Sequence, residues 1–97
     1  MTTGPAPGLR TEEVLDAPDG ASVSLVRVDP GASGRRPPFP TKRREVVVVI
    51  AGVLELRIGD ATEALHAGDA IVVETEPVAG RRNPSPEEAV AVWTVFA

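Results

Sequence analysis

The sequence predicts an all-β protein built as an antiparallel sandwich or barrel. Apolar and polar residues alternate with a period of two, β-branched residues dominate these short runs, and Gly, Pro and Asp separate them. The separations are about 8 to 12 residues, which is the spacing of small sandwiches and barrels. We expect one compact domain over residues 11–97, preceded by a disordered tail over residues 1–10.

The first half of the chain contains three clear strand patterns. Apolar and polar residues alternate over residues 22–28, and this segment ends at an Asp-Pro-Gly turn signal. Residues 45–50 form a continuous apolar run, as expected of a strand covered on both faces, and residues 53–58 alternate again. Residues 9–17 fit either one helical turn or an edge strand around residues 13–15.

The second half continues the pattern after the hairpin signal Gly59-Asp60. Further strands are expected in four places, which are residues 61–66, 70–74, a short segment around 80–83, and 89–96. Six or seven short strands and almost no helix result.

Composition excludes several classes of function. The chain has no cysteine, so disulfides, thiolate catalysis and thiolate metal sites are absent. Residues 1–10 lack the apolar core of a signal peptide, and no run reaches the roughly 18 apolar residues of a membrane-spanning helix, so we expect a cytoplasmic protein. A net charge of −4 disfavours nucleic acid and anionic membranes as partners.

The basic residues are concentrated in two stretches without acids, residues 34–44 and 77–84. They comprise Arg35, Arg36, Lys42, Arg43, Arg44, Arg81 and Arg82. If both stretches meet at one mouth of a barrel, they form a positive rim that favours an anionic ligand or an acidic carrier protein. The alternative is that they are ordinary solvated strand ends.

Several spacings together resemble a known family. Glu45 is followed after six residues by Gly52, a Gly-Asp hairpin and a second Gly-Asp turn follow within residues 58–73, and Asn83 precedes the last strand. In this order the sequence resembles the cupins over residues 22–96. The resemblance implies an antiparallel double-stranded β-helix, that is, a jelly-roll barrel.

The chain departs from the metal-binding members of that family. Those cupins hold a metal with three histidines and the first-motif glutamate, and imidazole suits iron, nickel, copper or zinc. Residues 38–41 and Ala79, where the resemblance places the histidines, contain none, and the sole histidine, His66, falls in a hairpin turn. We therefore predict a metal-free cupin without a cofactor. Of the four metal-ligand positions of the family, only the glutamate, Glu45, is retained.

Seven residues are the candidates for a site. Glu45 is expected to point into the barrel among valines, where desolvation favours a neutral carboxyl and makes it a usable general acid or base. One of Arg81 and Arg82 must point inward, and we assign Arg82 to hold a developing oxyanion. The expected ligand-binding residues are Phe39, Thr41, Glu74, Arg81 and Trp93, and Glu74 faces Glu45 in this scheme.

Two kinds of function fit these residues. One is a metal-free biosynthetic enzyme that isomerises, cyclises or dehydrates an anionic or polyketide-like molecule by proton transfer, in which case Glu45→Gln abolishes turnover without lowering the melting temperature. The other is a non-catalytic cupin that binds a small molecule or docks a partner. A metal-dependent dioxygenase with an atypical ligand set is a third alternative. Apolar strand edges in a short chain also predict a homodimer.

Overall fold

The computed structural model describes residues 9–16, 21–35, 44–74, 76 and 78–96. All regular structure in these ranges is β-strand. The strands in chain order are β1 (Leu9–Asp16), β2 (Ser22–Val28), β3 (Ser33–Arg35), β4 (Arg44–Ala51), β5 (Val53–Ile58), β6 (Ala61–His66), β7 (Ala70–Val73), β8 (Val78–Arg82) and β9 (Ala89–Phe96).

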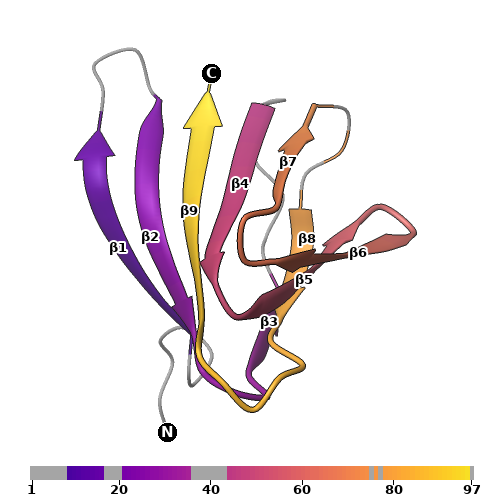
Figure 1. Cartoon of the computed structure of the whole chain (residues 1–97). Coiled ribbons are helices and arrows are strands. Elements are labelled where there is room, and N and C mark those ends of the chain that lie inside the picture. Colours follow the sequence, from indigo (N-terminus) through magenta and orange to yellow (C-terminus); the bar gives the residue numbers. More distant parts are fainter. Residues whose placement is uncertain (1–8, 17–20, 36–43, 75, 77, 97) are drawn as a thin grey trace, which may run out of the picture.

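The strands form two antiparallel sheets (Figure 1). One sheet has five strands in the order β1-β2-β9-β4-β7, and the other has four in the order β3-β8-β5-β6. The chain passes between the sheets repeatedly, so that the last strand lies between β2 and β4. This arrangement confirms the all-β, antiparallel prediction.

Three elements differ from the expectation. Residues 9–16 form β1, an edge strand of the five-stranded sheet, which confirms the edge-strand alternative over the helical turn. The strand is longer than residues 13–15 and begins at Leu9, inside the predicted tail; residues 1–8 lie outside the described residues. The short strand β3 lies in a segment for which no strand was predicted, and it forms by pairing with β8. β8 begins at Val78, two residues before the predicted start.

The core lies between the two sheets and is almost entirely aliphatic. Alternate positions of β2, β4, β5 and β9 point inward, since strand residues face opposite sides in turn. The buried apolar residues are Val26, Val28, Val47, Val49, Leu54, Leu56, Leu65, Val73, Val78, Ala89, Val90, Ala91, Trp93 and Val95. Each fully buried Val or Leu contributes about 1.5–3 kcal/mol, so this layer is the main source of stability.

Gly52 makes the tight connection between β4 and β5. Its φ of 75° is in the left-handed region, and a Cβ placed there would lie 2.6 Å from the carbonyl oxygen of Glu88. A glycine is therefore required seven residues after Glu45, both by the backbone conformation and by the neighbouring backbone.

Candidate functional site

Glu45 is a carboxylate buried between the two sheets. Strand alternation turns it inward from β4 together with Val47 and Val49, and it is 0% exposed. Its Oε1 accepts a 2.7 Å hydrogen bond from Nε1 of Trp93, and its Oε2 accepts a 3.3 Å hydrogen bond from the backbone N–H of Val78. Both carboxylate oxygens are therefore used by protein donors, which offsets the cost of burying the group.

Trp93 connects Glu45 to a positive charge. It stands on β9 beside Val47 and is 3% exposed. The guanidinium carbon of Arg81 lies 5.5 Å from the centroid of the indole ring, which is within cation–π range. Arg81 is in register with the fully buried Leu56, so its side chain is on the inner face of β8. A line of contacts thus crosses the interior from β4 through β9 to β8.

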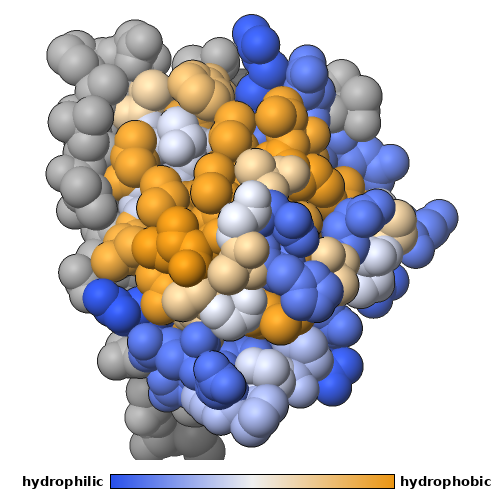
Figure 2. Space-filling model, in the orientation of Figure 1, coloured by the Kyte–Doolittle hydropathy of each residue, from blue (hydrophilic) through white to orange (hydrophobic). Residues whose placement is uncertain are grey.

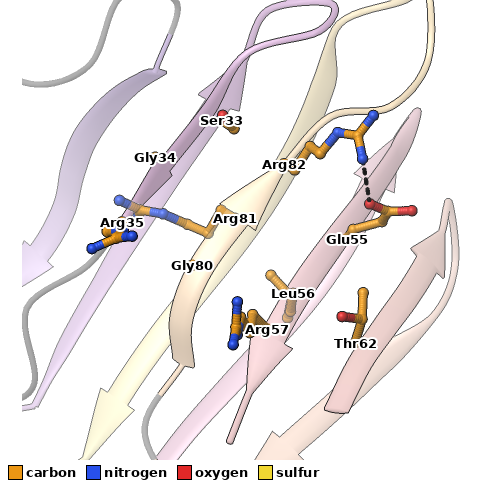
Figure 3. Close-up of a pocket in the computed structure, with 10 residues that line it drawn as sticks. All are labelled: Ser33, Gly34, Arg35, Glu55, Leu56, Arg57, Thr62, Gly80, Arg81 and Arg82. Atoms are coloured by element: carbon orange, nitrogen blue, oxygen red, sulfur yellow. Dashed lines mark ion pairs between the residues drawn. The ribbon is translucent and has the colours of Figure 1, made fainter. Parts of the chain in front are cut away.

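Arg82, the neighbour of Arg81, points the other way. It is in register with Glu55, and its Nη1 lies 3.7 Å from Oε1 of that residue on the outer face of the four-stranded sheet (Figure 3). The side chain is 63% exposed. The structure therefore brings Arg81 to the Trp93–Glu45 pair and leaves Arg82 on the opposite side of the sheet.

The other candidate residues do not gather around Glu45 in the described structure. Glu74 follows β7 and is exposed, whereas its neighbour Val73 is the buried register partner of Glu45. The two carboxylates are thus not in one pocket. Phe39 and Thr41 lie outside the described residues.

The predicted positive rim is not a single surface in the described part of the chain. Arg35 and Arg82 lie on the outer face of the four-stranded sheet, Arg44 is exposed at the start of β4, and Arg81 points inward. The remaining members, Arg36, Lys42 and Arg43, lie outside the described residues.

Asn83 is a buried polar residue whose role the sequence pattern did not reveal. Its amide nitrogen donates to the carbonyl oxygens of Val28 (3.0 Å) and Glu87 (2.6 Å), and its Oδ1 accepts from the backbone N–H (2.9 Å) and the hydroxyl (2.9 Å) of Ser85. It fixes the connection between β8 and β9, which brings the strand of Trp93 into place. The available signal for Asn83 in the sequence was its position just before the last strand, which is part of the family resemblance.

The donor groups of the residues that the structure describes do not fit a transition-metal ion. Among the described residues, no three or more His, Cys, Asp or Glu side chains converge. Glu45 already accepts two N–H groups, and the charged group beside its partner Trp93 is a guanidinium, which repels a cation. His66 is exposed at the end of β6, where its backbone N–H donates to Asp69, and Ala79 is exposed and supplies no ligand atom.

The comparison with protein families gives a clear result. The cupin domain profile matches residues 24–95, which is most of the chain and includes β4, β5, β8 and β9. This chain belongs to the cupin family. The predicted double-stranded β-helix is therefore confirmed, and the motif residues Glu45 and Gly52 have the buried and left-handed positions described above.

Solved cupin structures share the fold at low identity. The cupin domain of an XRE family transcriptional regulator from Enterobacter cloacae is 20% identical with a TM-score of 0.85, and the match covers 93% of this chain and 97% of that one. An uncharacterized double-stranded β-helix protein from Klebsiella pneumoniae is 25% identical, with a TM-score of 0.80 and coverage of 93% and 77%.

A third relative is longer than this cupin. An HTH_3 family transcriptional regulator from Vibrio cholerae is 15% identical with a TM-score of 0.82, and the match covers 93% of this chain but 51% of that protein. Comparison with curated proteins gave no match. The part of the chain that the structure describes includes no helix of the length and apolarity needed to cross a membrane.

Proposed function

We propose that this cupin is a binding domain for a small organic anion, and that Arg81 supplies the positive charge that recognises it inside the barrel. The observation that carries the proposal is the direction of Arg81, which points to the buried ring of Trp93 while Arg82 points to the outer face. Of the arginines whose side chains the structure describes, the others are exposed or lie on outer faces.

The geometry of the guanidinium supports recognition of an oxyanion. Stacking on an indole uses the face of the guanidinium, whereas its N–H donors lie in the plane of the group and suit carboxylate or phosphate oxygens. Gly34, the register partner of Arg81 on β3, has no side chain of its own beside the guanidinium-bearing residue. The buried residues around Trp93 are mostly aliphatic, so an apolar tail on the same ligand would be compatible with this interior.

Glu45 then has a positioning role. Its hydrogen bond holds the indole ring in one orientation, and the indole in turn fixes the surface on which Arg81 packs. A general acid or base must reach the proton that it transfers, but both oxygens of Glu45 are occupied by N–H groups and the residue is fully buried. This arrangement favours the binding function over the proton-transfer enzyme.

The proposal can be tested through Trp93, which is the sole tryptophan and therefore reports on this site by its fluorescence. Hexanoate is a suitable probe because it combines a carboxylate with an apolar tail. We expect hexanoate to change the emission of the wild-type protein, and Arg81→Met to weaken binding about tenfold or more, since it removes a charge-assisted hydrogen bond.

Arg82→Met is the matched control because it removes the adjacent guanidinium from the outer face. It should leave the hexanoate titration unchanged. The proposal fails if the wild-type emission does not respond to hexanoate, or if Arg81→Met and Arg82→Met bind it equally.

A further inference from the structure

A groove of about 560 Å³, whose lining residues are drawn in Figure 3, lies on the outer face of the four-stranded sheet. Trp93 lies on the other side of this sheet, next to the inward-facing Arg81. The walls of the groove come from β3, β8, β5 and β6, which supply outward-facing side chains at alternate positions. Gly34, Leu56 and Arg81 also line the groove although their register row faces the interior, so Arg81 borders both sites. Anion binding in the groove is expected to depend on the outward-facing side chains and not on the interior site proposed above.

One cross-strand row of the groove has two arginines on either side of a glycine. Arg35 on β3 is in register with Gly80 on β8, and Gly80 is in register with Arg57 on β5. Neighbouring strands lie about 4.8 Å apart, so the Cα atoms of the two arginines are roughly 10 Å apart across a position without a side chain. Both arginines are exposed.

Gly80 opens the row without being required by its backbone. A Cβ at this position would lie 3.5 Å from the carbonyl oxygen of Gly34 and 3.8 Å from the Cβ of Arg57, which are ordinary contacts. A side chain would therefore fit sterically but would fill the space between the two guanidinium groups. The glycine leaves an opening whose two sides are positively charged.

The adjacent row is electrically balanced. Arg82 is in register with Ser33 and with Glu55, and its Nη1 is 3.7 Å from Oε1 of Glu55. Three outward arginines thus face one carboxylate, which leaves an excess of two positive charges in the groove of a protein whose net charge is −4. Two guanidinium groups held on one sheet face favour a bound anion between them.

We propose that this groove binds a small oxyanion, a phosphate or carboxylate group of a small molecule, between Arg35 and Arg57 over Gly80. Each guanidinium offers paired N–H donors that match two oxygens of such a group. The hydroxyl of Thr62, in register with Arg57, adds a donor at the β6 side. The volume is within the range of about 300–1,000 Å³ for small-molecule sites, which favours a small ligand over an acidic protein segment.

The test is an NMR titration of the full-length protein with inorganic phosphate and, separately, with succinate at about 10 mM ionic strength, where screening is weak. We expect the backbone amide signals of Gly80, Arg57 and Thr62 to shift and, with phosphate, the indole N–H signal of Trp93 to stay in place. Succinate is itself a small organic anion, so a shift of Trp93 with succinate reports the interior site proposed above. A shift with phosphate alone indicates a phosphate site, a shift with succinate alone a carboxylate site, and both support the proposal.

Three variants test whether the outward-facing charges of the groove determine anion binding. Arg57→Ser should weaken binding about tenfold, because it removes one charged donor pair. Glu55→Gln should strengthen it several-fold, because it removes the competing carboxylate and the ion pair of Arg82. Arg44→Ser, a matched loss of an exposed arginine from the other sheet, should leave it unchanged.

Three outcomes overturn the proposal. One is the absence of shifts at Gly80 with both anions. Another is an equal loss of binding in Arg57→Ser and Arg44→Ser, which indicates non-specific charge attraction. The third is binding of hexaglutamate, with shifts beyond the groove, when neither small anion binds, which indicates an acidic protein partner. Because Glu55→Gln is expected to strengthen anion binding, the proposal can still be tested if Arg57→Ser fails to fold.

Discussion

Trp93 donates its indole N–H to Oε1 of Glu45 across 2.7 Å, and both side chains are buried between the sheets. The two residues are 48 positions apart in sequence and are brought together by the pairing of β4 with β9. With the Val78 N–H on the other oxygen, this bond gives the family glutamate a structural task in this chain.

Glu45→Gln should lower the free energy of unfolding by about 1–3 kcal/mol. The amide can accept from only one of the two N–H groups, so its own NH₂ group must face the other donor. Chemical denaturation followed by Trp93 fluorescence measures the change. Glu74→Gln, a surface control, should stay within about 0.5 kcal/mol of wild type.

The same experiment separates the two roles weighed for Glu45. If burial among valines destabilised the Glu45 carboxylate, replacing it with a neutral amide would not lower the stability of the protein, and this is the outcome that the sequence favoured. A carboxylate that accepts two N–H hydrogen bonds loses stability when one acceptor is removed. A Glu45→Gln variant as stable as wild type would therefore contradict the structural role.

Much of this fold was predictable because its signals are local. Period-two alternation located β2, β5 and β9, and the spacing of Glu45 and Gly52 placed the glutamate inward and the glycine at the turn. β3 was missed because three residues in an Arg- and Gly-rich segment show no alternation of their own and depend on β8 for pairing.

The site was less predictable because it depends on register between distant strands. Because side chains alternate along a strand, Arg81 and Arg82 are expected to face opposite sides of the sheet. Only the pairing of Arg81 with Leu56 decides which of the two faces inward. A register shift between Arg57 and Ile58 complicates any count from the buried end of β8. Arg57 itself was overlooked because its partners in the outer groove, Arg35 and Gly80, come from other strands.

Asn83→Asp should destabilise the protein by about 3 kcal/mol or more. The substitution removes both hydrogen bonds to carbonyl oxygens and places a carboxylate against those same oxygens in a buried position. Ser85→Ala, which removes only the hydroxyl contacts of this network, should cost about 1 kcal/mol. Equal losses in the two variants, measured by denaturant unfolding, would show that the Asn83 amide is not the centre of the network.

Gly52→Ala should be much more harmful than Gly31→Ala, although both glycines have a φ near +75° (75° and 73°). At Gly31 a Cβ meets nothing within 4 Å, so the cost is the backbone strain of about 1–2 kcal/mol. At Gly52 the Cβ would also lie 2.6 Å from the Glu88 carbonyl oxygen, which adds about 1–3 kcal/mol. Thermal unfolding of the two variants measures the difference, and similar melting temperatures would rule out the close contact.

The outer face of the five-stranded sheet predicts self-association. Its central strands present Val46, Val48, Val72 and Val92 in neighbouring register rows, and Figure 2 shows a broad hydrophobic surface over these strands. Val72 and Ile50 are 59% and 53% exposed. Because the outward positions of β4, β7 and β9 in these rows carry no charge, two copies can pack these strands face to face without burying an unpaired ion.

Val72→Lys should therefore convert a dimer to a monomer. A lysine at the centre of such an interface costs a buried charge on each copy, while in the monomer it is solvated at no cost to the fold. Light scattering after size-exclusion chromatography gives the mass, and circular dichroism checks the strands. Ala64→Lys, exposed on the other sheet, should remain dimeric. A wild-type protein that is monomeric at every concentration, or a Val72→Lys variant that stays dimeric, would place this face in solvent or against another partner.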